Sequence, residues 1–289
     1  MTTFQEKCSI RLLTKKWHCC ASSRNYKNRL MKMSWVTGNF FTQNKTTMLF
    51  LSVVFFFASS AATLEIVAQR KFSKIYPASK NVRLQLTNRT GTVVVEGWDR
   101  EEINISAYLE APAANIIPQS LSGTIYINLV KDNQGRNDVG SVNFLIKVPF
   151  SASVDIETKM GNLNVSSVRG GLVRAHITTE GDITLTDISA TNVSAENVIG
   201  DILFDGTVET EGNYRITSIR GNINLRIPFD SSFKLQATAP STRNISLGEF
   251  GNSNMKFFSD GRRVIGQAGD GSATIVVTNQ RGSISFIRR

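Results

Sequence analysis

The chain has 289 residues and a formal net charge of +10, which first suggests a nucleic-acid partner. Residues 1–47 hold nine Lys or Arg and one Glu, so the rest carries only +2 and shows no basic stripe with interleaved aromatics. We therefore expect no nucleic-acid partner. All three cysteines, Cys8, Cys19 and Cys20, also lie in this segment, so the remainder has no thiol for a disulfide, a nucleophile or a metal.

Residues 1–47 form a basic leader, which we expect to be disordered or not translated. Met33 and Met48 are alternative starts for translation. The leader also contains His18 beside Cys19 and Cys20, which resembles a zinc site. Adjacent cysteines lack the spacing of two to four residues that lets two thiolates reach one tetrahedral ion. We therefore predict no zinc site.

Residues 48–62 indicate export. Thr46–Leu64 contains no charged residue, and Met48–Ala58 is almost continuously apolar before the small residues Ser59–Ala62. The apolar core is shorter than the roughly 20 residues that span a bilayer, which favours a signal peptide cleaved near Ala62. The alternative is an uncleaved anchor at residues 48–64, with the basic leader kept in the cytoplasm. Both place the body outside, in the periplasm or at the cell surface, and only an uncleaved anchor would contact the membrane.

The body begins at residue 80, after a lead-in segment at residues 63–79, and is organised by a short repeat. Two alternating apolar residues precede a small polar residue, and a glycine three positions later precedes two more alternating apolar residues. Alternation with a period of two predicts strands with one buried face, and the shared glycine predicts the same tight turn each time. The predicted turn glycines are Gly91, Gly161, Gly181, Gly200, Gly221 and Gly282.

The spacing of this repeat predicts the fold. The four central glycines lie 20, 19 and 21 residues apart. About 20 residues are too few for a βαβ unit but suit two strands and two turns, which make one rung of a solenoid. We predict an all-β parallel β-solenoid with about 20 residues per rung, each rung stacked on its predecessor. The alternative is an antiparallel β-sandwich, which does not explain the constant interval.

A longer repeat supports the solenoid. The segment from Val148 to Ile156 matches that from Ile227 to Leu235, offset by 79 residues, and each contains a Pro-Phe pair that should begin a fresh rung. Pro149 and Pro228 should therefore end strands or occupy corners. The copy before Gly181 slips by one residue, and residues 131–140 should form an exposed loop. No sustained period of 3.6 residues appears, so helix should be minor.

The opening copy continues into Gly97-Trp98-Asp99-Arg100. Gly97 lies outside the repeat register, so a substitution there should be milder than one at Gly200. With the Pro-Phe corners and the closing strand after Gly282, this element resembles the "putative adhesin" domain family of bacterial envelope proteins over residues 80–289. The resemblance implies a β-solenoid outside the cytoplasmic membrane with an adhesive or envelope-associated role, and structural rather than catalytic roles for Trp98, Pro149 and Pro228.

Catalytic constellations are scarce in the body. His176 is its single histidine, so Ser-His-Asp and multi-histidine metal arrangements are not expected, and we predict no cofactor. The competing function is a polysaccharide-active β-helix enzyme that uses carboxylate pairs. Its candidate carboxylates are Asp155 and Glu157 on an outward strand face and Glu180, Asp182 and Asp201 near the turns. A further alternative is an envelope-stress sensor or a regulatory partner of a membrane protein.

One column of side chains is a weak candidate for a metal site. The residue after the turn glycine is Asn162, Asp182, Asp201 and Asn222 in successive rungs, so stacking should align these four. Calcium accepts such oxygens, but the favoured interpretation is a ladder in which each side chain bonds its local backbone. We expect a non-catalytic exported protein that binds a surface, a glycan or an envelope protein.

Overall fold

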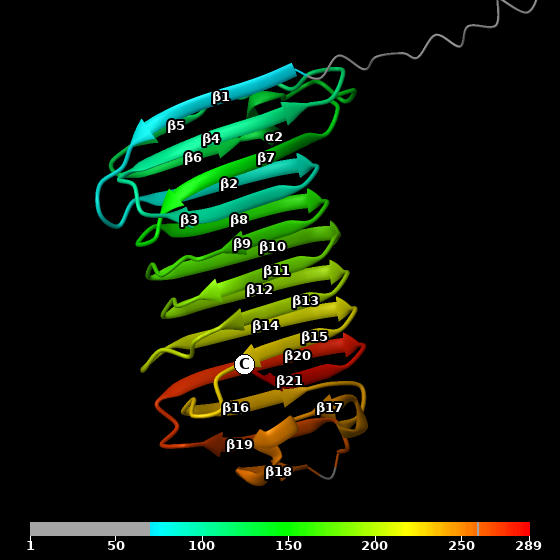
Figure 1. Cartoon of the computed structure of the whole chain (residues 1–289). Helices are drawn as coiled ribbons and strands as arrows, with labels where there is room; N and C mark the ends of the chain where they lie inside the picture. Colours follow the sequence, from blue (N-terminus) through cyan, green and yellow to red (C-terminus); the bar gives the residue numbers. More distant parts are fainter. Residues whose placement is uncertain (1–69, 259) are drawn as a thin grey trace, which may run out of the picture. The chain divides into compact units, whose positions relative to one another are not determined.

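The computed structural model describes residues 70–258 and 260–289, which form two stacked β-sheets (Figure 1). The leader at 1–47, the export segment at 48–62 and residues 63–69 of the lead-in segment lie outside the described residues. Among the residues described, no helix is both long and apolar enough to cross a membrane.

Each sheet is defined by the spatial order of its hydrogen-bonded strands. Sheet A contains β1 (Arg70–Pro77), β4 (Glu102–Leu109), β7 (Val142–Pro149), β3 (Val93–Trp98), β9 (Leu163–Ser166), β11 (Ile183–Ile188), β13 (Ile202–Gly206), β15 (Ile223–Ile227), β21 (Ile284–Arg288) and β17 (Ile245–Ser246). Sheet B contains β18 (Asn254–Phe257), β19 (Arg263–Ala268), β16 (Phe233–Thr238), β20 (Ala273–Arg281), β14 (Asn213–Arg220), β12 (Asn192–Ile199), β10 (Leu172–Glu180), β8 (Ser153–Met160), β2 (Arg83–Thr90), β6 (Thr124–Asn128) and β5 (Gln119–Leu121).

Helix is minor in the described residues. The α-helix α2 (Leu129–Asp132) follows β6, and the 3₁₀ helices η1 (Thr242–Asn244) and η2 (Gly248–Asn252) flank β17. The exposed loop predicted at residues 131–140 begins inside α2, where the side chain of Asn128 accepts a hydrogen bond from the Lys131 N–H at 2.9 Å. The predicted all-β class is confirmed.

The middle of the molecule is a parallel solenoid. A rung consists of one strand of sheet B and the sheet A strand that follows it in the chain. Strands β9, β11, β13 and β15 pair in parallel, with Leu163, Ile183 and Ile202 in register. Among the described strands, antiparallel pairing occurs only near the two ends of the solenoid, as between β1 and β4 or β16 and β19. This topology confirms the solenoid and excludes the antiparallel sandwich.

The core lies between the sheets and is built by the period of two. Along β13 the inward Ile202 and Phe204 are buried and the residue between them is not. Each described rung contributes such residues to one continuous apolar cluster. The C-terminal end of this cluster is aromatic, since Phe250 of η2 packs edge-on against Phe233 and Phe286 with ring centroids 5.3 and 6.2 Å away.

The six turn glycines stack in one column. Gly200 has φ of +130°, and a Cβ there would lie 2.1 Å from the carbonyl oxygen of Gly181. A Cβ on Gly221 would likewise lie 1.9 Å from the carbonyl oxygen of Gly200. Glycine therefore satisfies two constraints at this corner, a left-handed backbone and the close approach of the neighbouring rung.

The small polar residue of the repeat closes the same turn. Nδ2 of Asn197 donates to the carbonyl of Gly200 in its own turn at 2.7 Å, and Nδ2 of Asn279 donates to the carbonyl of Gly221, the turn glycine of the neighbouring rung, at 2.7 Å. Both side chains are buried, so these bonds satisfy carbonyls that lack a strand partner. In β10 the matching position holds Ile177, and a β-bulge after it restores the register, which explains the slip before Gly181.

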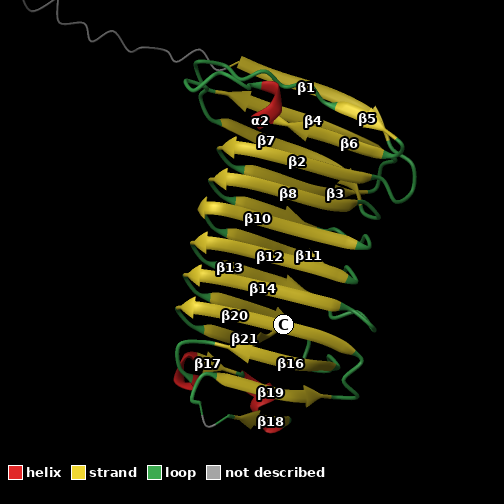
Figure 2. Ribbon diagram, turned by 180° about the vertical axis from the view of Figure 1, so that it is seen from behind, coloured by secondary structure: helices red, strands yellow, loops and turns green. Residues whose placement is uncertain are grey.

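The rungs do not stack in chain order, contrary to the expectation that each lies on its predecessor. The β2/β3 rung lies between β6/β7 and β8/β9, and the C-terminal β20/β21 rung lies between β14/β15 and β16/β17. Figure 2 shows β20 between β14 and β16. Parallel rungs offer equivalent edges, so the local repeat does not specify which rung occupies which level.

At each of the two Pro-Phe corners the chain skips over one rung of the solenoid, which another part of the chain fills. After Pro149 the chain leaves β7 and enters β8, which lies beyond the β2/β3 rung. After Pro228 it leaves β15 and enters β16, beyond the β20/β21 rung. The 79-residue repeat is thus a repeated crossing, and each crossing begins where proline cannot continue the strand ladder.

Gly97 is tightly constrained although it lies outside the repeat register, and its milder response than Gly200 stays a prediction. This residue is buried in β3, and a Cβ there would lie 1.9 Å from the carbonyl oxygen of Ser167. The next residue, Trp98, donates from Nε1 to the carbonyl of Glu102 at 2.8 Å and so ties β3 to the start of β4. The Gly-Trp element therefore packs a second corner of the solenoid.

Candidate functional site

The column after the turn glycines is a hydrogen-bonded ladder between rungs. Oδ1 of Asp182 accepts from the N–H of Asp201 at 2.8 Å, and Oδ1 of Asp201 accepts from the N–H of Asn222 at 2.7 Å. Oδ1 of Asn162 accepts from the N–H of Asp182 at 3.1 Å. The predicted alignment is present, but each side chain bonds the next rung rather than its local backbone.

Each of these two carboxylates thus has a backbone N–H donor from the following rung. The described residues contain no group of three or more His, Cys, Asp or Glu side chains that could hold a metal. The calcium hypothesis for Asp182 and Asp201 stays a prediction.

Asp155 points outward from β8 but is only 5% exposed, because two arginines cover it. Oδ2 lies 2.6 Å from Nη2 of Arg83 and Oδ1 lies 3.1 Å from Nη1 of Arg174, so cations from both neighbouring strands hold the carboxylate. Glu157 aligns across the strands with His176, which in turn aligns with Glu196. Asp155 is thus part of an ionic ladder along the sheet rather than a free general acid or base.

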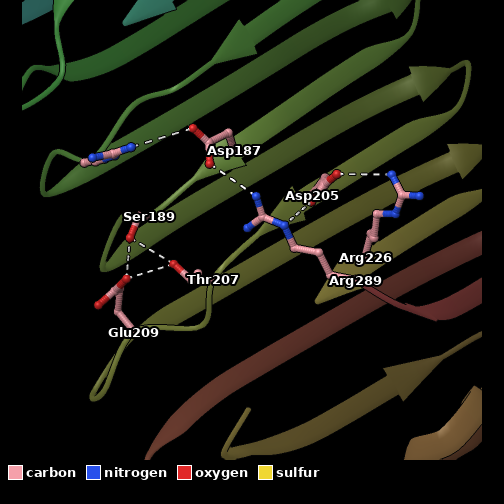
Figure 3. A network of polar contacts seen from close by, with 8 residues as sticks. Asp187, Ser189, Asp205, Thr207, Glu209, Arg226 and Arg289 are labelled. Carbon is pink, nitrogen blue, oxygen red and sulfur yellow. Dashed lines mark hydrogen bonds and ion pairs between the residues drawn. The ribbon is translucent and has the colours of Figure 1, made fainter. Parts of the chain in front are cut away.

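Figure 3 shows a network at a corner of sheet A. Nη2 of Arg289 lies 3.2 Å from Oδ1 of Asp187, and Nε of Arg289 lies 3.2 Å from Oδ1 of Asp205 without the alignment of a hydrogen bond. Arg226 contacts the second carboxylate oxygen of Asp205 at 3.4 Å. The C-terminal residue therefore joins levels that lie far apart in the sequence.

The second half of this network surrounds a buried tyrosine. The hydroxyls of Ser189 and Thr207 both donate to Oε1 of Glu209, while the N–H of Glu209 donates to Oη of Tyr214 at 2.7 Å. Tyr214 donates in turn to the carbonyl of Ala190 at 3.0 Å. Burial raises the pKa of Tyr214 from 10.0 to about 12, and the charge of Glu209 adds to this rise.

The network in Figure 3 holds Ser189 beside a carboxylate but not beside a histidine. His176 projects from β10 in sheet B, in register with Glu157 of β8. Ser189 therefore belongs to no Ser-His-Asp arrangement. The hydroxyls and carboxylates of this corner join adjacent rungs.

A hollow of about 320 Å³ lies beside the Gly-Trp element and is lined by Trp98, Phe150, Lys80 and Arg100. Cations already lie over the Trp98 ring, with the Arg100 guanidinium at 5.1 Å and the Lys147 ammonium at 5.7 Å from its centroid. Because these contacts occupy the aromatic ring, it is poorly placed to stack on a ligand.

A groove of about 430 Å³ opens on the outer face of sheet B, where β18, β19, β16 and β20 lie side by side. Lys234 and Gln236 reach it from β16, Lys256 from β18, and Gln267 from β19, with Asn254, Ile265, Thr274 and Val276 completing the outward lining. The register sets Lys234 beside Gln267 and Gln236 beside Ile265. Antiparallel addition of β19 and β18 thus brings lysines of β16 and β18 to one groove.

The charge of this face is one-sided. The five strands β14, β20, β16, β19 and β18 contain no Asp or Glu. Lys234, Lys256 and Arg215 are exposed on them, and within the described residues no ion pair or side-chain hydrogen bond engages these three. Lys234 and Lys256 therefore present cationic groups in the groove that a partner could contact.

Comparison with known proteins places the chain in a family. The family described as Toastrack DUF4097 matches residues 42–286. The chain belongs to the Toastrack DUF4097 family. This match confirms the family resemblance and the solenoid-like fold class expected from the repeats. No curated protein matches the chain.

Several solved structures resemble this Toastrack chain. A putative cell adhesion protein from Clostridium sporogenes is 12% identical with a TM-score of 0.43, and the match covers 76% of this chain and 100% of that protein. A putative adhesin from Bacteroides fragilis is 9% identical with a TM-score of 0.37, covering 76% and 99%. A putative adhesin from Parabacteroides merdae is 9% identical with a TM-score of 0.27, covering 76% and 96%.

Sequence reasoning missed both the groove and the corner network of this Toastrack chain. Tyr214 carried a usable signal, because an inward tyrosine in an apolar repeat requires a hydrogen-bond partner. Arg289 carried none, since its carboxylate partners precede it by 102 and 84 residues. The groove depends on β20 entering between β14 and β16, and no local pattern encodes that insertion.

Proposed function

We propose that this Toastrack chain is an exported, non-catalytic module that binds a surface partner through the groove on sheet B. One observation carries the proposal: Lys234 and Lys256 line one groove without an internal ion pair, whereas carboxylates such as Asp155 and Asp201 bond neighbouring rungs. Side chains such as Asp155 and Asp201 stabilise the stack, while Lys234 and Lys256 contribute nothing visible to it.

The rigid stack suits a binding role. Parallel rungs repeat side-chain positions about every 4.8 Å along the sheet, so the outer face is a flat, regular array of polar groups. Such a face can contact an extended or repetitive partner without a deep pocket. Export is supported by the sequence alone, through the apolar run at residues 48–58 and the small residues that follow it.

Export can be tested by fusing residues 1–69 to alkaline phosphatase, which is active only outside the cytoplasm. We expect activity in intact cells. A control fusion with Val54→Arg and Phe56→Arg interrupts the apolar run and should be inactive. Equal activity of both fusions would contradict export through this segment.

Binding can be tested by applying the labelled full-length chain to an array of neutral and acidic glycans and to extracted envelope fractions. Soluble products are measured in parallel as released reducing ends. We expect retention on at least one surface and no release of product. Product release would refute the non-catalytic proposal, and failure to be retained on any surface would refute the binding proposal.

A further inference from the structure

We propose that the groove on sheet B binds an acidic polysaccharide, with Lys234 and Lys256 contacting its carboxylates. This inference rests on the proposed binding function and names the class of partner. It begins from the charge of the five strands around the groove, which lack Asp and Glu. Clustered cations without carboxylates attract polyanions and repel other cations.

The remaining lining favours a polyhydroxylated ligand. Gln236, Gln267 and Asn254 supply amide donors and acceptors, and Thr274 supplies a hydroxyl. Such groups can bond sugar hydroxyls in either direction. Ile265 and Val276 add small apolar areas suited to the C–H faces of a sugar ring. A simple anion-binding patch would need only the lysines.

The architecture of the groove argues against an acidic peptide. Peptides that bind β-proteins commonly add a strand to a free sheet edge, where main-chain hydrogen bonds provide affinity. Here the ladder positions of β16 face β19 on one side and β20 on the other, and the sheet edge lies at β18, beyond β19. The floor of the groove therefore contacts a ligand through side chains, which suits a saccharide better than a peptide backbone.

A long ligand in the groove could contact several cationic side chains. Arg215 lies in register with Val276, which is in register with Gln236, so Arg215 occupies the same outward row two strands from the lysine-bearing β16. A ligand that runs across the strands from Lys256 toward Arg215 would meet positive charge at both ends. We therefore expect binding to strengthen with ligand length.

The test is a titration of the full-length chain with polygalacturonate, a linear carboxylated polysaccharide, against dextran, a neutral one. We expect binding of polygalacturonate that weakens as salt is added, and no binding of dextran. Lys234→Gln with Lys256→Gln should weaken binding about tenfold through the loss of two charge-assisted contacts. Both lysines are exposed, so the melting temperature should not change.

The matched control is Lys80→Gln with Lys159→Gln, which removes the same charge from exposed positions outside the groove. We expect the control to bind like the wild type. Equal losses in both double variants would reduce the effect to overall charge and overturn the inference. A loss in the control alone would move the site toward the Trp98 hollow, which Lys80 lines, and would also overturn it.

Two further binding measurements distinguish a failure of this inference from a failure of the proposed function. Poly-L-glutamate binding as tightly as polygalacturonate would overturn the assignment to a polysaccharide. If the wild type binds envelope fractions but not polygalacturonate, the ligand class is refuted and the binding function is retained. Release of reducing ends from polygalacturonate would refute the non-catalytic function itself.

Discussion

Two constraints act on glycines of the solenoid, a left-handed φ and the close approach of a neighbouring backbone. Four glycines represent the four combinations of these constraints, so alanine substitutions can separate their effects. At Gly200 a Cβ meets both a left-handed φ of +130° and the Gly181 carbonyl oxygen at 2.1 Å. At Gly97 the φ is ordinary but the Ser167 carbonyl oxygen lies 1.9 Å away. At Gly135 the φ is +81° with open space, and at Gly171 neither constraint applies.

The expected changes in the free energy of unfolding follow from these geometries. Gly171→Ala should stabilise the fold slightly, by up to about 1 kcal/mol, because alanine lowers the backbone entropy of the unfolded chain. Gly135→Ala should cost about 1–2 kcal/mol through left-handed strain alone. Gly200→Ala should cost about 3–5 kcal/mol, because the neighbouring rung must also move and weaken bonds such as that from the Gly200 N–H to the Arg220 carbonyl, now 2.9 Å.

Gly97→Ala is the informative member of the set. Only the clash acts there, and we expect a loss of about 2–4 kcal/mol from the displaced backbone. Urea unfolding followed by circular dichroism measures all four variants on one scale. A Gly97→Ala variant as stable as Gly171→Ala would show that rung spacing is not limiting, and the account of close approach would be wrong.

Three other variants test the core, the corner and the alkaline limit. Ile202→Asp should lower the free energy of unfolding by about 4 kcal/mol or more, because it buries an unpaired charge. Asp201 is exposed, so Asp201→Ala should lower it by only about 1 kcal/mol. Equal small losses in thermal melts of the two variants would contradict the assignment of Ile202 as inward and Asp201 as outward. Arg289→Ala should lower the free energy of unfolding by about 1 kcal/mol because Asp205 loses an ion pair, and the loss should be smaller at high salt. An unchanged urea midpoint would show that Arg289 does not stabilise this corner. Tyr214 keeps its proton in the folded state to a pKa of about 12 against 10.0 unfolded, so stability should be full below pH 10 and fall between pH 10 and 12. Tyr214→Phe should remove this alkaline step, and a step that persists in the variant would refute its assignment to Tyr214.

Local features of the fold were predictable because they are encoded within one rung. The Asn-x-x-Gly turn around Gly200 combines a side chain that closes the turn with a residue that tolerates both its φ and its neighbour. The one-residue slip before Gly181 was visible as a break in alternation and is a β-bulge. These signals require no knowledge of which rung lies above or below.

The order of the rungs was not predictable, because it depends on contacts between rungs and not on the sequence within one rung. The edges of β14 and β16 accept β20 in the same parallel register, so an insertion between them leaves no mark on the alternating pattern. The Pro-Phe repeat at Pro149 and Pro228 was visible, yet its meaning as a crossing over one level required the strand pairing. The groove was not predictable for the same reason, because its two lysines come together only through the pairing of β16, β19 and β18.

The location of binding tests the account most directly. Amide chemical shifts of the ¹⁵N-labelled full-length chain would be followed while oligomers of polygalacturonate are added. We predict that the largest shifts fall in β16, β18, β19 and β20, around Lys234 and Lys256. Shifts centred on Trp98 and Phe150, or on the corner around Glu209 and Tyr214, would contradict the assignment of the groove as the binding site.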